Sequence, residues 1–272
     1  MPTASVNGIA LHYREAGEGF PIVLIHGYTG NSRNWALTIP ALAGRFHTIS
    51  VDLRGHGHSA KPLRQEDYTV EAMAADVDAL IRHLGVSECF LAGHSMGGMI
   101  AQYLILSRPE PFRALVLVDT AAERPSGMRM EERARLVEIA RTRGLEAVFE
   151  EQLEANPLAD QFRARPDLLE NYRQEFLMTS PEAYIHCAAA MAARSPLLEE
   201  LPRIKAPTLI ICGQNDEPFV QPSQNMHERI TGSELAILPG AGHTPQIETP
   251  AQFNSVLTGF LSKVHGAVAA GG

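Results

Sequence analysis

A serine stands between two glycines in the segment Gly93-His94-Ser95-Met96-Gly97. An apolar run, residues 89–92, precedes it and a second apolar stretch, residues 99–104, follows, so the serine lies where a buried strand ends and a helix begins. The two glycines remove side chains that would collide as the strand and the helix approach each other. Chance can produce the same spacing, but in this setting the pattern predicts a serine hydroxyl presented at the end of a strand.

Two further residues could activate this serine. A serine hydroxyl is a weak nucleophile at neutral pH, so it needs a base, and the base needs a carboxylate to orient it. Asp216 and His243 each follow shortly after an apolar, strand-like run, residues 207–212 and 234–238 respectively. We therefore predict Ser95 as the nucleophile, His243 as the base and Asp216 as the acid that orients His243.

The sequence offers two rivals for the acid. Asp119 directly follows the apolar run 114–118, and Glu217 is the neighbour of Asp216. Asp216 is favoured because it lies three residues past Gly213, a glycine that lets the chain turn as a strand ends. Glu217 would point elsewhere if Asp216 faces His243, since adjacent residues rarely share a direction. Asp119 is the stronger of the two rivals.

The elements that must position these residues form an alternating pattern of strands and helices. Short apolar runs are typical of parallel strands buried on both faces. Helical periodicity over residues 70–84 and 250–264, together with a helix near residues 35–42, supplies the crossovers. An edge hairpin is expected at residues 5–14, around the turn pair Asn7-Gly8. The sequence therefore predicts an α/β fold with a doubly wound, mostly parallel sheet.

Residues 121–205 interrupt this alternation. They hold 27 of the chain's 54 charged residues, show no strand pattern and contain four helix-like stretches. Ordinary crossover helices are the alternative, but the segment is far longer than one crossover. We predict a core formed by residues 1–120 and 206–265, a helical cap formed by residues 121–205, and a disordered tail at residues 266–272.

Composition narrows the classes of partner. The chain has 272 residues and a net charge of −8, which argues against binding to nucleic acid or to an anionic membrane. The three cysteines show neither metal-ligand spacing nor a pairing pattern. Residues 1–5 do not resemble a secretory signal, and no apolar run is long enough to span a bilayer. We expect a cytoplasmic protein that acts on a small molecule; the sequence does not indicate an oligomeric state.

The chain resembles the α/β-hydrolase fold family along nearly its whole length. His26-Gly27 matches the loop that binds the oxyanion, residues 52–59 match a D-x-R-G-x-G-x-S segment, and residues 93–97 match the nucleophile turn. The acid turn and the histidine loop correspond to residues 213–216 and 242–243. The resemblance implies that the backbone N–H groups of Tyr28 and Met96 form an oxyanion hole.

Within this family, the segments 180–184 and 206–208 are similar to enol-lactonases and carboxylesterases. They are more distantly similar to C–C bond hydrolases of aromatic ring cleavage, although those hydrolases generally have Asn where this chain has His94. Ser95 distinguishes the chain from dehalogenases and epoxide hydrolases, which use an aspartate nucleophile. We expect an ester or lactone hydrolase working through an acyl-enzyme. The alternatives are a C–C hydrolase, for which a cation in the cap is expected, and a ligand receptor built on this scaffold.

No cofactor or metal is expected. His56 and His58 lie two residues apart in a glycine-rich loop and could suggest a metal site, but no third ligand stands near them in the sequence. Trp35, Tyr184 and His186 are aromatic candidates for substrate contact, although packing explains each of them equally well.

Overall fold

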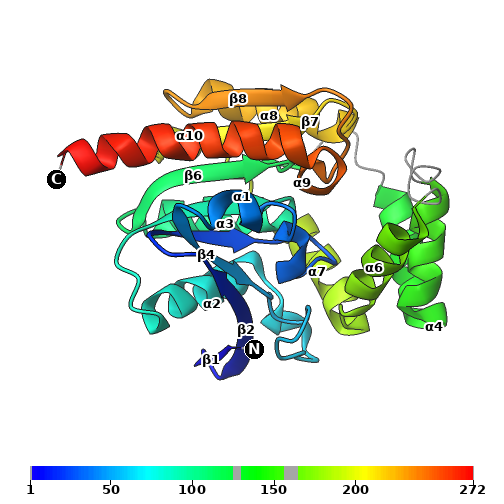
Figure 1. The fold of residues 1–272 in the computed structure, drawn as a ribbon. Coiled ribbons are helices and arrows are strands. Elements are labelled where there is room, and N and C mark those ends of the chain that lie inside the picture. The colour runs from blue at the N-terminus through cyan, green and yellow to red at the C-terminus, as the bar shows by residue number, and fades with distance from the viewer. Residues whose placement is uncertain (1, 125–129, 156–164, 272) are drawn as a thin grey trace.

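A computed structural model describes residues 2–124, 130–155 and 165–271. Its centre is an eight-stranded sheet with the strand order β1-β2-β4-β3-β5-β6-β7-β8 (Figure 1). β1 and β2 pair antiparallel with their neighbours, and all other pairs are parallel. The predicted α/β class and mostly parallel sheet are confirmed.

The strands are short, as their apolar runs predict. Their bounds are β1 Thr3–Val6, β2 Ile9–Ala16, β3 Phe20–Ile25, β4 Phe46–Val51, β5 Cys89–His94, β6 Phe112–Val118, β7 Thr208–Gly213 and β8 Glu234–Leu238. The helices of the core are α1 Ile39–Leu42, α2 Val70–His83, α3 Met96–Ser107, α8 Glu217–Arg229, α9 Pro245–Glu248 and α10 Pro250–Gly271. Within the part of the chain that the structure describes, no helix is both long and apolar enough to cross a membrane.

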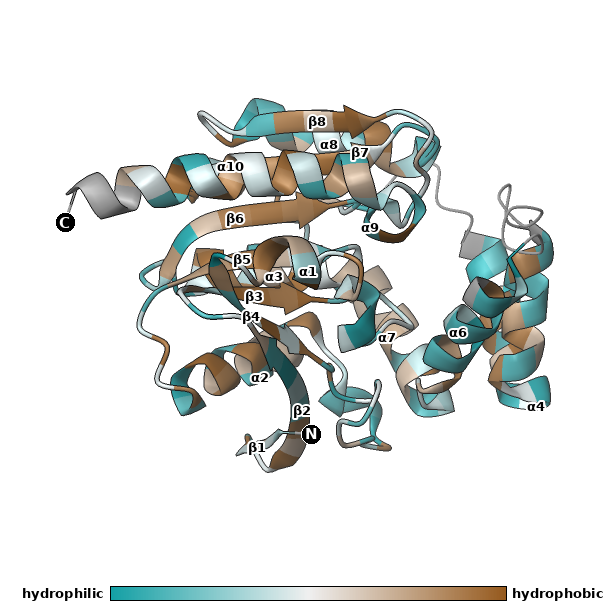
Figure 2. Cartoon of the chain, in the orientation of Figure 1, coloured by the Kyte–Doolittle hydropathy of each residue, from teal (hydrophilic) through white to brown (hydrophobic). Residues whose placement is uncertain are grey.

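Helices cover both faces of the sheet. Val23 and Ile25 of β3 belong to the apolar cluster that includes residues of α2 and α3, whereas Ile22 and Leu24 belong to the cluster that includes residues of α1 and α10. Alternate residues of β3 therefore enter opposite layers, which is why this strand is apolar along its length (Figure 2). This burial fixes the strand register and places the loops that follow β3, β5, β7 and β8 at one edge of the sheet.

The edge hairpin forms as predicted. Asn7 and Gly8 connect β1 to β2 with φ angles of 47° and 78°, the left-handed pair that a type I′ turn requires.

A helical insertion separates β6 from β7 and lies beyond the carboxyl ends of the parallel strands (Figure 1). It contains α4 Met130–Ala155, α6 Pro166–Leu177 and α7 Pro181–Ala193. Gly144, with a φ of 82°, divides α4 into two helical pieces. The insertion has its own apolar cluster, in which Val148, Phe149 and Phe176 are buried. Within the described residues of this insertion, helices cover the three helix-like stretches that the sequence places near residues 145–153, 168–176 and 180–191.

Two expectations need correction. The helix expected near residues 35–42 is two separate pieces, a 3₁₀ turn at Ser32–Trp35 and α1 at Ile39–Leu42. Pro40 explains the break, because proline is tolerated only in the first turn of a helix. The tail expected to be disordered is helical as far as Gly271, because α10 continues through an alanine-rich segment that favours helix; residue 272 lies outside the described residues.

The glycines around Ser95 provide a test of the fold. A β-carbon on Gly93 would overlap the backbone of Gly97, so Gly93→Ala should lower the free energy of unfolding by about 3 kcal/mol or more. Gly259 in α10 has open space around it, so Gly259→Ala should raise the same quantity by about 0.5–1 kcal/mol. Urea unfolding of both variants measures the difference. Equal stability of the two variants would contradict the close approach of β5 and α3.

Candidate active site

Ser95 forms the turn between β5 and α3. Its backbone has φ 51° and ψ −115°, a strained conformation for a residue with a side chain. The turn is held from both sides: the Ser95 N–H donates to the carbonyl of Val118 at 2.8 Å, and the Thr120 hydroxyl donates to the carbonyl of Ser95 at 2.7 Å. The neighbouring strand β6 and the residues after it therefore stabilise the strained turn.

The structure brings together the three residues predicted to act together. His243 Nδ1 lies 2.7 Å from Asp216 Oδ2, and His243 Nε2 lies 3.0 Å from Ser95 Oγ. The carboxylate of Asp216 only accepts hydrogen bonds, so Nδ1 carries the proton and Nε2 is free to accept the hydrogen of the Ser95 hydroxyl. The loops after β5, β7 and β8 each contribute one member of this hydrogen-bonded chain.

Burial and charge tune the histidine and its acid. Burial alone would lower the pKa of His243, but the charge of Asp216 and the hydrogen bond to it outweigh burial, and the pKa is raised. Burial alone would raise the pKa of Asp216, but the interaction with His243 outweighs it, and the pKa is lowered. Asp216 is therefore ionised at neutral pH and favours a positive charge on His243.

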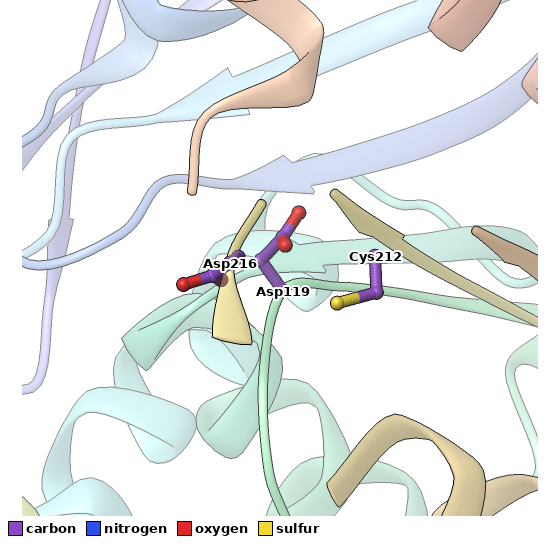
Figure 3. A group of neighbouring side chains, drawn as sticks. All are labelled: Asp119, Cys212 and Asp216. Atoms are coloured by element: carbon purple, nitrogen blue, oxygen red, sulfur yellow. The ribbon is translucent and has the colours of Figure 1, made fainter. Parts of the chain in front are cut away.

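Asp119, the stronger rival for the acid, lies behind Asp216 rather than against His243. It is fully buried, has a φ of 41°, and its Oδ1 accepts the N–H of Gly213 at 2.9 Å. Figure 3 shows Asp119 beside Asp216 and Cys212, and one ligand atom from each of these residues lies within 4.8 Å of the other two. Asp119 thus holds the turn that carries Asp216. Glu217, the other rival, is an exposed residue at the start of α8.

The surroundings of Asp119 favour the neutral, protonated form of its carboxyl group. Burial raises its pKa well above the ordinary value, and the negative charge of Asp216 raises it further. Two adjacent carboxylates cannot both remain ionised away from water, and Asp216 keeps the charge because His243 contacts it.

A pair of substitutions tests the protonation of Asp119. Asp119→Asn keeps a neutral group of the same shape that accepts the Gly213 N–H, so the free energy of unfolding at pH 7 should stay at or above that of the unmodified protein. Asp119→Leu leaves that N–H buried without a partner and should lower the same quantity by about 1–3 kcal/mol. Urea unfolding at pH 7 compares them. If the asparagine variant loses as much stability as the leucine variant, Asp119 is ionised.

The loop after β3 faces the start of α3. Among the described residues, no hydrogen bond in the loops, turns or caps uses the backbone N–H of Tyr28 or of Met96. Met96 is the first residue of α3, where N–H groups have no partner inside the helix. Both groups are therefore available as donors, as the resemblance implies.

Contacts with the insertion hold this loop in place. The Tyr28 hydroxyl donates to the backbone carbonyl of Tyr184 in α7, and the two rings stack with their centroids 5.0 Å apart. A few residues further on, Asn34 Nδ2 donates to Glu175 Oε2 of α6 at 3.0 Å. The position of the loop thus depends on the insertion as well as on the sheet.

The glycine-rich segment at residues 52–59 is held by hydrogen bonds of two buried side chains, Asp52 and His56. Asp52 accepts hydrogen bonds from the N–H groups of Ser32 at 2.7 Å and His58 at 2.9 Å. Burial alone would raise the pKa of Asp52, but these hydrogen bonds outweigh burial, and the pKa is lowered. His56 is buried, donates from Nδ1 to the carbonyl of Arg54 at 2.9 Å, and has a pKa lowered to about 3 by burial. These contacts stabilise the loop of residues 52–59.

Neither histidine of this loop belongs to a metal-ligand cluster. Over the described ranges, the one group of three residues with suitable ligand atoms close together is Asp119, Cys212 and Asp216. Two of its oxygens have protein partners, since Asp119 Oδ1 accepts from Gly213 and Asp216 Oδ2 accepts from His243, whereas Asp119 Oδ2 is buried with no hydrogen-bond partner among the described residues. We assign this cluster to the support of His243.

Sequence reasoning missed two residues beside the hydrogen-bonded chain. His94 Nε2 donates to the carbonyl of His243 at 2.7 Å. Burial lowers the pKa of His94 to about 3, so a neutral His94 connects the two loops. Arg133 of α4 places its guanidinium carbon 5.5 Å from the centre of the Tyr28 ring. The position of His94 before the serine was a usable signal, whereas Arg133 is one of many charged residues in the insertion.

A profile of the alpha/beta hydrolase fold matches residues 21–250. The chain belongs to the α/β hydrolase fold family. It is 28% identical to 3-oxoadipate enol-lactonase 2 of Acinetobacter baylyi over 264 residues, covering 96% of each sequence.

Two solved structures are similar throughout. One is the enol-lactonase from Burkholderia xenovorans LB400, with a TM-score of 0.88 and 31% identity, covering 96% of this chain and 100% of the other. The second is a thermophilic esterase from Thermogutta terrifontis, with a TM-score of 0.86 and 32% identity, covering 97% of each. This α/β hydrolase is therefore similar to both enol-lactonases and esterases.

Proposed function

We propose that this α/β hydrolase cleaves a carboxylic ester or a lactone through an acyl-enzyme. The observation that carries the proposal is the chain from Asp216 through His243 to Ser95, with heavy-atom distances of 2.7 Å and 3.0 Å at a strained turn. The similarity to enol-lactonases and esterases supports this choice of substrate bond.

The mechanism follows from the hydrogen-bond directions. Ser95 Oγ attacks the carbonyl carbon while His243 Nε2 takes the hydroxyl proton, and Asp216 stabilises the imidazolium that forms. The N–H groups of Tyr28 and Met96 bind the oxyanion, whose charge develops only on the way to the tetrahedral intermediate. His243 then returns the proton to the leaving alkoxide and activates a water that hydrolyses the acyl-enzyme. Each step uses a group of this chain, so we propose that no metal or cofactor takes part.

A panel of substrates tests the reaction class. p-Nitrophenyl esters of increasing chain length, several lactones and one ring-cleavage diketone acid are assayed with the same protein. Ester or lactone turnover supports the proposal, faster cleavage of the diketone acid points to a C–C hydrolase, and tight binding with very slow turnover points to a receptor.

The nucleophile can be tested by a single substitution. Ser95→Ala removes one oxygen and no core packing, so the fold should remain while kcat on the best ester falls by about 10⁴-fold or more. Circular dichroism serves as the control for folding, and addition of EDTA to the unmodified protein should leave its rate unchanged. Retention of more than about a tenth of kcat by Ser95→Ala would rule out the acyl-enzyme.

The pH dependence follows from the raised pKa of His243. Below that pKa the imidazole is protonated and cannot take the serine proton, so kcat/KM should fall on the acid side with a midpoint above the ordinary histidine value of 6.5. Asp216→Asn should move this midpoint down and reduce kcat by about 10³–10⁴-fold, because the amide cannot stabilise the imidazolium. Profiles of kcat/KM from pH 5 to 9 for both proteins measure the two midpoints. A midpoint below 6.5 in the unmodified protein would argue against this pairing.

A further inference from the structure

Arg133 is a half-buried cation that the insertion places above the loop of Tyr28. Its guanidinium carbon lies 5.5 Å from the centre of the Tyr28 ring, and its Nη1 atom is buried without a hydrogen-bond partner. The aromatic face offers only a weak attraction to a cation. Among the residues that the structure describes, this buried guanidinium nitrogen has no acceptor, so it can bind an acceptor from a ligand.

Neighbouring arginines of the same helix behave differently. Arg135 lies 2.8 Å from Glu151 and Arg143 lies 3.5 Å from the same carboxylate. Among the described residues, no Asp or Glu oxygen lies within 4.0 Å of Arg133, so nothing there neutralises its charge as Glu151 does for the other two. Arg133 differs from them in being half-buried against the ring of Tyr28, whereas both of the others are exposed.

The position of Arg133 relates it to the reacting groups. It lies on the ring of Tyr28, whose backbone N–H is the proposed oxyanion donor, and that ring stacks on Tyr184. Its charge also reaches His243: burial and Arg133 both act to lower the pKa of that histidine, against Asp216 and Glu248, which raise it. A molecule held at Ser95 therefore lies within the field of this guanidinium.

We propose that Arg133 binds a carboxylate of the substrate, so that the preferred ester or lactone carries a negative charge beside the bond that is cleaved. A guanidinium matches a carboxylate with two parallel N–H bonds, and pairing is strongest where water is excluded. The identity of the cleaved bond rests on the proposed function. The binding of a carboxylate by Arg133 does not depend on which bond is cleaved.

Matched pairs of substrates test the preference. One pair is p-nitrophenyl hydrogen glutarate and its methyl ester, which places the charge on the acyl side. The other pair is 4-carboxyphenyl acetate and its methyl ester, which places the charge on the leaving group. In at least one pair the charged member should have the higher kcat/KM, and added salt should reduce the advantage.

Substitution then assigns that preference to one residue. Arg133→Gln should lower kcat/KM for the favoured charged ester by about 100-fold, mainly through KM, and change the neutral ester by less than about threefold. Arg133→Lys should restore part of the loss, and Arg133→Met keeps the apolar stem as a check on folding. Arg135→Gln, two residues away and paired with Glu151, is the matched control and should leave both rates unchanged.

A binding measurement separates this inference from the proposed function. Titration calorimetry of monomethyl glutarate into Ser95→Ala needs no turnover, and binding should weaken by about 100-fold when Arg133→Gln is added to that variant. Binding that depends on Arg133 supports the carboxylate site even if no ester is hydrolysed. Equal rates for charged and neutral members of both pairs, or equal binding with and without Arg133, would overturn it.

Discussion

The close approach of β5 and α3 at Ser95 is the constraint on which the site depends. A serine with a φ of 51° is tolerated because Gly93 and Gly97 let the two elements meet and because β6 holds the turn through the carbonyl of Val118. The same turn leaves the N–H of Met96 without a helical partner. One local distortion therefore places Ser95 Oγ 3.0 Å from His243 Nε2 and leaves the N–H of the following residue without a helical partner.

A second constraint is the placement of charge behind the histidine. Asp119 and Asp216 follow neighbouring strands, and their pKa values are shifted in opposite directions. Asp119, buried and raised in pKa, fixes the turn at Gly213, while Asp216 takes the negative charge because it contacts His243. The neutral His94 then fixes the backbone of His243 from the opposite side. Asp216 and His243 are thus each positioned beside a buried group, Asp119 or His94, whose surroundings favour its neutral form.

The helical insertion also positions the loop that follows β3. Its helices hold the loop of Tyr28 by a stacked ring and a hydrogen bond from Tyr28 to Tyr184, and Asn34 is tied to Glu175. The proposed oxyanion donor and Arg133 are therefore positioned by the same part of the chain.

The sequence alone determined the sheet and most of the site, because these depend on local patterns. Buried parallel strands require uninterrupted apolar runs, and the turn of Ser95 requires glycines at fixed spacing, so both are visible in one dimension. The sequence favoured Asp216 over Asp119 by its spacing from Gly213, but only the tertiary structure shows that Asp216 contacts His243 and that Asp119 contacts the N–H of Gly213. It likewise revealed the contact between His94 and His243, 149 residues apart, and separated Arg133 from the other arginines of the insertion. Charge and burial at such positions arise from segments that come into contact only when the chain folds, and the periodicity of the sequence does not indicate which segments these are.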